Sequence, residues 1–240
     1  MKSLHGKVFF VGAGPGDPNL LTIMALRLIQ SARIIVYDSL VSSEIMSLVP
    51  EDSEKIPVRI NVHDRGMTPA EIGNVMIQKV ASGNDVIRLK SGDPMIFART
   101  GEEIEVLEEN GIDYDIIPGI SSSIASAAVS KTMITDRRFS SSVAIVTGHE
   151  IKDKNGKRID WGKISGSVDT LIVMMGLSTL QSYLSEMVKS GLDSRSGITL
   201  VFDATRSTQK IIKSTVEKIL SDKLVPCSDL CTVIIQKYRR

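Results

Sequence analysis

Four turns rich in glycine each follow a short apolar run, and they are the segments of this chain best suited to binding a small molecule. Glycine and proline at the end of a strand let the backbone approach a ligand closely, because no bulky side chain intervenes. Open α/β sheets bind ligands at the carboxyl ends of their strands. The four turns are residues 11–18, 89–94, 117–123 and 146–149. Several such turns in one chain predict one shared site for a small molecule.

The first turn, Gly12-Ala13-Gly14-Pro15-Gly16-Asp17, permits a dinucleotide interpretation. The dinucleotide fingerprint is Gly-x-Gly-x-x-Gly, and here Asp17 stands in place of the third glycine. Asp38 ends an apolar run and would imitate the ribose-binding acid of such a fold. Asp17 would repel a phosphate, however, so the turn is better suited to a neutral or cationic part of a ligand. NAD binding and a tight turn that binds nothing both stay open at this point.

Charged residues follow the second turn, Ser91-Gly92-Asp93-Pro94. Asp93 is placed to accept hydrogen bonds from ribose hydroxyls or an amino group, and the alternative is an Asx-type turn that caps the next helix. Arg99 is a candidate carboxylate clamp, because a guanidinium forms bidentate pairs with carboxylates. The neighbouring Glu102 and Glu103 suit the positive N-terminus of a helix.

Composition and missing motifs exclude several classes of protein. The 240 residues carry a formal net charge of +1, so no overall field draws the chain towards nucleic acid or a membrane. No apolar run reaches the ~18 residues of a membrane span, and the start of the chain lacks the apolar segment of a signal peptide. We therefore expect a cytoplasmic protein. The three histidines do not have metal-ligand spacing, and no P-loop sequence occurs, so we expect neither a metal site nor a P-loop NTPase.

Short β-branched runs alternate with helical patterns, which predicts an α/β fold with a mainly parallel sheet and covered faces. The expected strands are residues 8–11, 34–36, 86–89, 114–117, 143–147, 170–174, 198–201 and 230–236. The expected helices are residues 20–31, 69–82, 101–109, 121–129, 179–189 and 215–223. The pattern changes after Pro118-Gly119, and we expect an N-terminal domain over residues 1–117 and a C-terminal domain over residues 118–240. Residues 150–166 are expected to form a polar insert.

The motifs together resemble the tetrapyrrole methylase family over nearly the whole chain. The most specific of them are Tyr37-Asp38-Ser39-Leu40-Val41-Ser42, Arg88-Leu89-Lys90-Ser91-Gly92-Asp93-Pro94 and Thr147-Gly148-His149, in this order. The segments at residues 11–18, 99–103 and 118–122 extend the resemblance. It implies two α/β domains with S-adenosylmethionine in the cleft between them, usually in a homodimer.

The resemblance also implies which residues bind the cofactor. They are Gly14, Pro15, Ser91, Gly92, Asp93, Ile96, Ser121, Ser122, Met175 and Ala204. Family residues that bind substrate or handle protons align with Arg99, Glu102 and Arg137, and a proposed proton acceptor aligns with Asp38. An alternative for Arg137 is a pair of surface arginines with Arg138.

The reaction that the resemblance implies is the transfer of two methyl groups to C2 and C7 of uroporphyrinogen III, which gives precorrin-2 by way of precorrin-1. Family members usually carry Gly-Lys-Arg after the third strand, whereas this chain has Arg59-Ile60-Asn61, and Arg59 or Arg65 would have to supply the positive charge. This difference keeps open a methylase of the same family that acts on a later corrin precursor. A dinucleotide-binding module without catalysis is the alternative from another class.

Overall fold

The structure is a computed structural model that describes residues 6–59, 66–149, 159–222 and 227–237. The chain divides into two compact units, Met1–Ser122 (unit 1) and Ser123–Arg240 (unit 2). Residues 118–122 belong with unit 1, since the Gly119 amide donates to the Asp93 carboxylate. The domain boundary expected between residues 117 and 118 stays a prediction.

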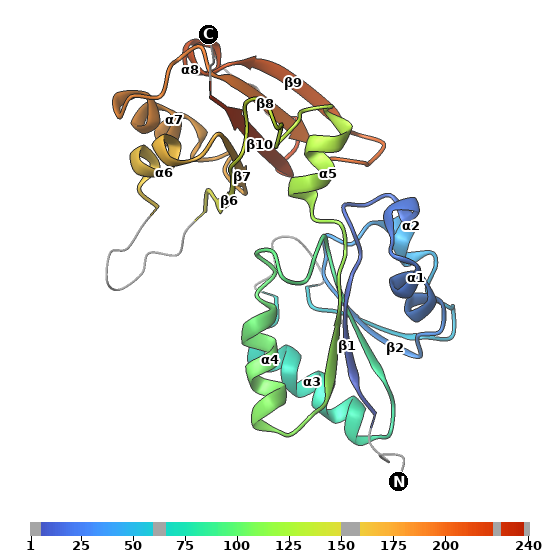
Figure 1. Cartoon of the computed structure of the whole chain (residues 1–240). Coiled ribbons are helices and arrows are strands. Elements are labelled where there is room, and N and C mark those ends of the chain that lie inside the picture. Colours follow the sequence, from blue (N-terminus) through green and yellow to red (C-terminus); the bar gives the residue numbers. More distant parts are fainter. Residues whose placement is uncertain (1–5, 60–65, 150–158, 223–226, 238–240) are drawn as a thin grey trace. The chain divides into compact units, whose positions relative to one another are not determined.

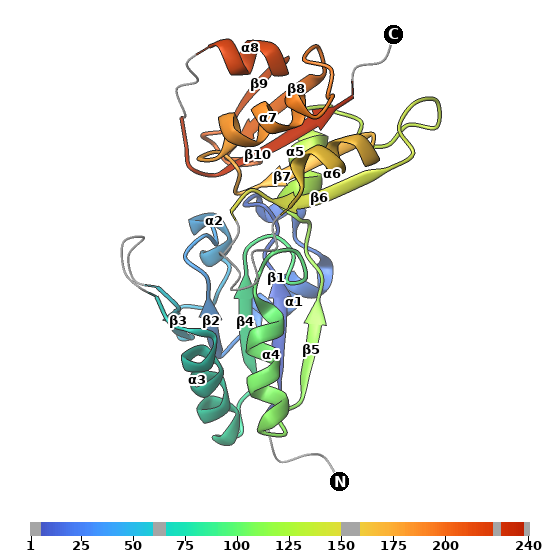
Figure 2. The same cartoon turned by 90° about the vertical axis from the view of Figure 1, so that its left-hand side faces the viewer.

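Unit 1, which carries helices α1 to α4 in Figure 1, contains a five-stranded sheet. Its strand order, β3-β2-β4-β1-β5, can be followed in Figure 2. All its pairings are parallel, as the alternation of strands and helices predicts. The strands are β1 (Val8–Gly12), β2 (Ile34–Tyr37), β3 (Glu54–Pro57), β4 (Val86–Lys90) and β5 (Tyr114–Ile117). Because all five run the same way, the turns that follow them meet at one edge of the sheet.

Helices cover both faces of this sheet (Figure 2). The helical elements are η1 (Pro18–Leu20), α1 (Ile23–Gln30), α2 (Ser43–Met46), α3 (Pro69–Ala81) and α4 (Thr100–Glu109). Successive side chains of a strand point to opposite faces. In β1, Phe9 and Val11 accordingly pack with α1 and α2, whereas Val8 and Phe10 pack with α3 and α4.

Local signals in the sequence explain where two of these helices begin. The Thr68 hydroxyl accepts from the Glu71 amide, and the Glu71 carboxylate accepts from the Thr68 amide, which forms a capping box before α3. Thr22 caps α1 in the same way by accepting from the Ala25 amide. The helix expected from residue 20 therefore begins at Ile23, and η1 precedes it.

Unit 2 contains a mixed sheet in the order β6-β7-β10-β8-β9. Only β6 and β7 pair in parallel; the other three pairings are antiparallel. The strands are β6 (Val143–Thr147), β7 (Thr170–Met174), β8 (Gly197–Phe202), β9 (Lys210–Thr215) and β10 (Cys231–Gln236). Consequently β6, β7 and β8 all run in one direction, and the turns after them share one edge of this sheet.

The two faces of the unit 2 sheet have different cores. One face packs on α6 (Trp161–Ser167), α7 (Leu180–Lys189) and α8 (Val216–Ser221) in a large apolar cluster. The other face meets α5 (Ser122–Val129), where Ala127 packs with Ile172 and Ile234. Alternation along β7 and β10 sends successive side chains to these two cores.

Four elements differ from the sequence-based expectation. The insert expected over residues 150–166 is wrong in its second half, because Trp161 and Ile164 pack on the large core and form α6. Its residues 150–158 lie outside the described residues, as does Arg65. The short elements α2, β3 and β9 were not expected. In β3 and β9 exposed lysines and a glutamate hide the apolar alternation, because both are edge strands.

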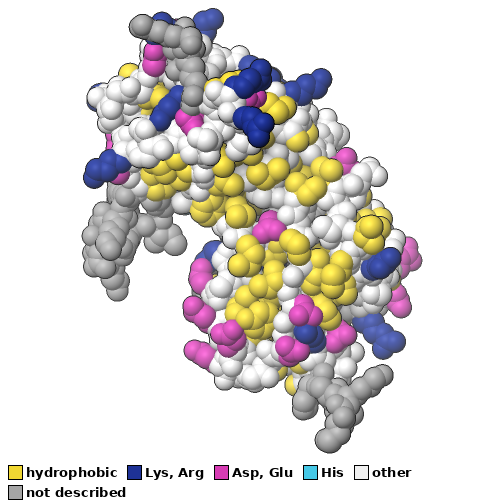
Figure 3. Space-filling model, viewed as in Figure 1, with side chains coloured by type: hydrophobic (Ala, Val, Ile, Leu, Met, Phe, Trp, Pro, Cys, Tyr) yellow, Lys and Arg dark blue, Asp and Glu magenta, His cyan; other side chains and the backbone are white. Residues whose placement is uncertain are grey.

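The surface carries charges of both signs. On the face shown in Figure 3, acidic and basic side chains are scattered among apolar and neutral ones. Within the described part of the chain, none of the helices is both long and apolar enough to cross a bilayer.

Candidate functional site

The neighbouring strands β1 and β4 form a topological switch point. The chain leaves β1 towards α1 on one face of the sheet, and it leaves β4 towards α4 on the other face. The two turns therefore diverge from adjacent strand ends, which is the usual ligand position in open α/β sheets. These turns are the first and second glycine-rich turns of the sequence.

Backbone hydrogen bonds join the two turns. The Gly14 amide donates to the Gly92 carbonyl at 3.0 Å, and the Gly92 amide donates to the Gly14 carbonyl at 2.8 Å. The Ala13 amide donates to the Lys90 carbonyl at 2.8 Å. Gly14 and Gly92 both have a φ of +69°, a conformation that glycine adopts without strain. The glycines are thus required by the backbone geometry of this contact.

The third turn packs against the first two. A Cβ on Gly119 would lie 2.3 Å from the Gly92 carbonyl oxygen and 2.8 Å from the Gly12 Cα. Asp93 reinforces the contact, because its Oδ2 accepts from the Gly119 amide at 3.0 Å and its Oδ1 accepts from the Met95 amide at 2.8 Å. Asp93 therefore makes an Asx turn, but it does not cap the next helix, because the N-cap residue of α4 is Arg99. We call the three joined turns, residues 12–18, 91–94 and 118–122, the glycine junction.

The glycine junction leaves room for a ligand atom beside Gly92. A Cβ built there would lie 3.8 Å from the Ser122 amide nitrogen and 3.9 Å from the Ser121 Cα, which are ordinary contact distances. Six of the predicted cofactor residues are thus brought together in unit 1: Gly14, Ser91, Gly92, Asp93, Ser121 and Ser122. Pro15 is buried next to them.

The junction is poorly suited to a pyrophosphate. The amides of Ala13 and Gly14 already donate to carbonyls, and Pro15 has no N–H group. The N-terminus of α1 begins only at Ile23, whereas a dinucleotide fold places a helix N-terminus directly after the glycine turn. These features favour a ligand whose nearest part is neutral or cationic.

A cluster of four charged side chains lies under the same edge of the sheet. Arg88 Nε donates to Glu103 Oε2 at 2.7 Å, and Arg88 Nη2 donates to Glu103 Oε1 at 2.9 Å. Arg88 Nη2 also reaches Asp38 Oδ1 at 2.6 Å, and Lys90 Nζ reaches Glu103 Oε1 at 2.6 Å. Arg88 and Lys90 are 1% exposed and Glu103 is 2% exposed. We call these four residues the buried charge cluster.

Burial perturbs the lysine of this cluster. Removal from water, followed by the charge of Arg88, lowers the pKa of Lys90 below its usual range, and the Glu103 carboxylate opposes this shift. Glu103 is therefore more than an acid at a helix N-terminus, which was the sequence-based interpretation. Its side chain is the common partner of both buried cations.

Arg99 and Glu102 lie on an exposed part of the first turn of α4. Arg99 Nε and Nη2 donate to the two Glu102 oxygens at 2.7 and 2.6 Å. The hydrogen bond from Arg99 lowers the pKa of Glu102. Arg99 has a φ of +54°, a strained conformation for a residue with a side chain, and such residues cluster at ligand sites. Both side chains are half or more exposed and are accessible to a substrate carboxylate.

The segment between the second turn and α4 is fixed at both ends. The Thr100 hydroxyl donates to the Pro94 carbonyl, and the Ile96 amide donates to the Asp93 carbonyl at 3.3 Å. Ile96, a predicted cofactor residue, is partly buried in this segment. The glycine junction and Arg99 are therefore connected through a short, hydrogen-bonded stretch of chain.

Unit 2 also carries strained turns at the shared edge of β6, β7 and β8. A Cβ on Gly148, after β6, would lie 2.2 Å from the Cα of Gly176, after β7. Met175 has a φ of +54° and is 49% exposed. Ala204 follows β8 between Asp203 and Thr205, whose φ angles are +46° and +68°. The predicted cofactor residues Met175 and Ala204 thus lie at one edge of their own sheet.

Arg137 lies in a turn of unit 2. The turn is closed by backbone pairing between Asp136 and Ser140, and Arg137 is exposed. Its neighbour Arg138 forms a bidentate pair with Asp136, and this hydrogen bonding lowers the pKa of Asp136 to about 2. Both arginines are exposed, so the alternative of a surface pair stays open beside the predicted substrate contact of Arg137.

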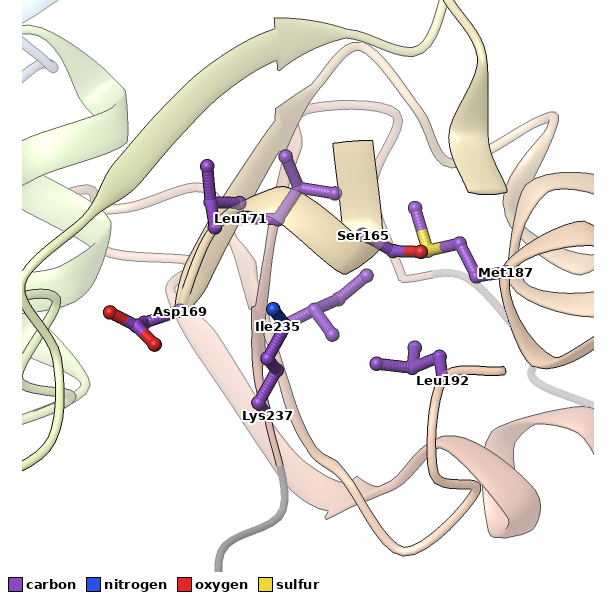
Figure 4. Close-up of a pocket in the computed structure, with 8 residues that line it drawn as sticks. Ser165, Asp169, Leu171, Met187, Leu192, Ile235 and Lys237 are labelled. Carbon is purple, nitrogen blue, oxygen red and sulfur yellow. The ribbon is translucent and has the colours of Figure 1, made fainter. Parts of the chain in front are cut away.

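A small pocket in unit 2 is lined by residues from α6, β7, α7 and β10 and from the segments next to them (Figure 4). Ser165 and Asp169 precede β7, and Lys237 follows the antiparallel β10. Most of the lining residues are apolar: Val168, Leu171, Met187, Leu192 and Ile235. Among the described residues, no group of three or more His, Cys, Asp or Glu side chains could hold a metal ion.

Sequence reasoning missed the buried charge cluster as a unit. Arg88 and Lys90 are charged residues two positions apart in an otherwise apolar strand, so they point to the same face of the sheet. Buried cations require carboxylate partners. This signal could have predicted an acid on the helix that covers this face, and Glu103 is that acid.

Comparisons with known proteins agree with one another. A family model described as Tetrapyrrole (Corrin/Porphyrin) Methylases matches residues 7–220. The uroporphyrinogen-III C-methyltransferase of Methanocaldococcus jannaschii is 38% identical over 218 residues, which cover 90% of this chain and 89% of that protein. The S-adenosyl-L-methionine-dependent uroporphyrinogen III methyltransferase of Methanosarcina barkeri is 39% identical over 221 residues, which cover 92% and 87%.

A solved structure is similar over the whole fold. It is the uroporphyrin-III C-methyl transferase of Thermus thermophilus complexed with S-adenyl homocysteine. The TM-score is 0.79 at 30% sequence identity, and the match covers 96% of this chain and 97% of that chain.

Proposed function

The chain belongs to the tetrapyrrole methylase family, and from this premise we propose that it is an S-adenosylmethionine-dependent methyltransferase that acts on uroporphyrinogen III. The expected products are precorrin-1 and, after methylation at both C2 and C7, precorrin-2. Relatives named for this reaction match about nine-tenths of the chain.

The observation that best supports the proposal is the glycine junction at the β1–β4 switch point. Its two central turns are held together by the amides of Ala13, Gly14 and Gly92, so these N–H groups are not available to bind an anion. A cationic sulfonium with an adenosyl group fits this surface better than a pyrophosphate does. The open position beside Gly92 admits a ligand in van der Waals contact with the backbone.

When bound, S-adenosylmethionine supplies an activated methyl group, so alignment with the pyrrole carbon provides much of the rate enhancement. The residues of this chain then have two tasks. Arg99 binds a carboxylate of the substrate by exchanging its Glu102 partner for it, since guanidinium groups favour bidentate carboxylates. Asp38 accepts the proton that the ring system must lose after methylation.

Three further residues keep their predicted roles on the family resemblance alone. Met175 and Ala204 are proposed as cofactor contacts, and Arg137 as a substrate contact. The exposure of Met175 and Arg137 is compatible with these roles. The resemblance also supports a homodimer, which sedimentation equilibrium at micromolar concentration would test. A single species of monomer mass would contradict that part of the proposal.

Calorimetry and turnover together test the function. We expect saturable binding of S-adenosylhomocysteine, and methylation of uroporphyrinogen III under anaerobic conditions, with NMR locating the new methyl groups at C2 and C7. NAD serves as the comparison ligand. Binding of NAD without S-adenosylhomocysteine would contradict the proposal. If the protein methylates a later corrin precursor and not uroporphyrinogen III, that precursor is the substrate. The different specificity would then be attributed to Arg59-Ile60-Asn61, which stands where the family usually has Gly-Lys-Arg.

A further inference from the structure

The buried charge cluster has no explanation in stability alone. Moving charges out of water is costly, and well-packed apolar side chains in place of a buried ion pair are often equally stable or more so. Arg88, Lys90 and Glu103 are nevertheless almost fully buried on an otherwise apolar face. The fourth member, Asp38, reaches the surface, because its side chain is 26% exposed. The cluster therefore connects the interior to one accessible carboxylate.

The geometry of Arg88 fixes this carboxylate. Two of its nitrogens hold Glu103, Nη2 also holds Asp38 Oδ1, and Nη1 donates to the Leu89 carbonyl at 3.2 Å. The Asp38 amide donates to the same Leu89 carbonyl at 3.1 Å. Main chain and side chain of Asp38 are thus both anchored to β4. Among the described contacts, Oδ2 is the oxygen of Asp38 that stays available.

We propose that Arg88 is a positioning residue that orients Asp38 for proton removal, and that Glu103 fixes Arg88 in turn. The inference rests on the proposed function, in which Asp38 is the base. In the step concerned, the methyl group has been added to a pyrrole carbon that already carries a side chain, so the ring is left as an iminium cation. A C–H bond of the methylene bridge beside this ring breaks, its electron pair neutralises the ring, and the proton passes to Asp38 Oδ2.

A carboxylate is a sufficient base for this step. The iminium ring is electron-poor, so the methylene bridge beside it loses a proton readily. The requirement is therefore an oxygen at a fixed position rather than a strong base. Arg88 supplies the fixed position, since its Nη2 holds Asp38 Oδ1 at 2.6 Å and restricts the side chain.

Glu103 has a second effect on the same site. Adjacent residues of a helix point about 100° apart, so anchoring Glu103 inward leaves Glu102 facing outward. Arg99 pairs with Glu102 one turn earlier. The buried charge cluster thus sets the orientation of the proposed base and of the proposed carboxylate clamp together.

The charged groups around Asp38 are few. Arg88 and Lys90 come from β4 and Glu103 comes from α4. Glu102 interacts electrostatically with Lys90, and Arg99 with Glu103, although these two exposed residues are paired with each other. In an Arg88→Met variant the Lys90–Glu103 pair remains, so the change at Asp38 is mainly the loss of its own cation.

A double-mutant cycle between Asp38→Asn and Arg88→Met tests the inference. We expect turnover to fall about 100- to 10,000-fold in Asp38→Asn, as for loss of a general base. We expect kcat to fall about 100-fold in Arg88→Met, with KM for uroporphyrinogen III unchanged within about threefold. The double variant should match Asp38→Asn within about threefold, because Arg88 acts through Asp38. Affinity for S-adenosylhomocysteine should stay unchanged throughout.

Two further variants keep the test decisive. Arg195→Met removes a bidentate pair with Asp193 far along the chain in unit 2, and its turnover should equal wild type. The triple variant Arg88→Met, Lys90→Met, Glu103→Leu removes all buried charges of the cluster, and it should fold while showing the same turnover loss as Arg88→Met.

The outcomes separate the two proposals. Wild-type protein that neither binds S-adenosylhomocysteine nor methylates uroporphyrinogen III would overturn the proposed function and this inference with it. An active wild type in which the effects of Asp38→Asn and Arg88→Met multiply would overturn the inference only. A folded triple variant with wild-type turnover would do the same.

Discussion

In unit 1 the turns after β1 and β4 are joined by reciprocal backbone hydrogen bonds, whereas in unit 2 the turns after β6 and β7 meet through the close contact of two glycines. The unit 1 edge lies over the buried charge cluster. The unit 2 edge lies over an apolar core that includes Val173 and Tyr183. Each edge is thus held in place by a different kind of interaction.

The difference assigns different chemical capacities to the two edges. Unit 1 brings a fixed carboxylate, an exposed arginine and an open backbone position to one edge of one sheet. Unit 2 presents an exposed methionine and strained backbone at Met175, Asp203 and Thr205. Such strain persists only where the surrounding structure enforces it. Proton handling is therefore expected to depend on unit 1, and substitutions in the two units should have different signatures.

The largest expected effect is on the stability of unit 1. Glu103→Leu leaves Arg88 and Lys90 buried without their shared carboxylate, and it should lower the free energy of unfolding by about 3–5 kcal/mol. Urea denaturation followed by circular dichroism would measure this change. The triple variant that also carries Arg88→Met and Lys90→Met should recover most of the loss. Equal destabilisation of both variants would mean that shape rather than charge is responsible.

The next effect separates turnover from cofactor binding at the unit 1 edge. Arg99→Ala should lower turnover about 100-fold through loss of the substrate carboxylate contact, while affinity for S-adenosylhomocysteine stays within about twofold. Steady-state kinetics and calorimetry would measure the two quantities. Arg195→Ala is the matched control, because Arg195 also forms a bidentate pair with an exposed carboxylate. Weakened cofactor binding in Arg99→Ala would show that Arg99 contacts the cofactor rather than a carboxylate of the substrate.

A smaller effect, on cofactor affinity, is expected from a substitution at Gly92. Gly92→Ala places a methyl group where we expect the cofactor, and affinity for S-adenosylhomocysteine should fall about tenfold or more. Gly111→Ala is a close control, since Gly111 has a φ of +67° and nothing within 4 Å of its Cβ position. Both variants carry similar backbone strain. Equal loss of affinity in the two would attribute the effect to stability.

The pH dependence of stability provides a finer comparison. The pKa of Lys90 is lowered by burial, so the unfolded chain holds that proton at pH values where the folded chain has released it. Stability due to Lys90 should therefore rise with pH between its folded pKa and its ordinary value near ~10.4. Comparing the unfolding free energies of wild type and Lys90→Met from pH 7 to pH 10 would measure this. An unchanged slope in the variant would contradict the assignment.

The smallest effect is expected in unit 2. Within the described part of the chain, the buried Tyr183 hydroxyl has no hydrogen-bond partner, so Tyr183→Phe should change stability by less than about 1 kcal/mol, and in the stabilising direction. The ring would keep its stack on Trp161, at 4.7 Å between centroids. Thermal unfolding would compare it with Glu103→Leu in unit 1. A loss as large as that of Glu103→Leu would remove the contrast between the two cores.

Sequence alone predicted the elements with strong periodicity and failed where context decides. Strands β5, β6 and β7 have the expected bounds, because apolar β-branched runs and flanking turns define them. The edge strands β3 and β9 were not predicted, since their exposed polar side chains interrupt the alternation of apolar and polar residues. The helix α6 was not predicted because it has few apolar residues, and these become informative only once the core that they cover is known.

The site shows the same division. The glycine-rich turns were predicted because turn chemistry is local, and an Asx turn at Asp93 was among the alternatives. The buried charge cluster was not predicted. The pairing of Arg88 with Glu103 can be recognised only once β4 and α4 are known to share a face of the sheet. Pairing between distant segments is the information that a single sequence lacks.

The central claim is that the glycine junction holds the methyl donor, and a crystal structure of the protein with S-adenosylhomocysteine tests it most directly. We predict ligand atoms in van der Waals contact with the Gly92 backbone and adjacent to Ser121 and Ser122. Ligand bound elsewhere on the protein, with these positions unoccupied, would contradict the account.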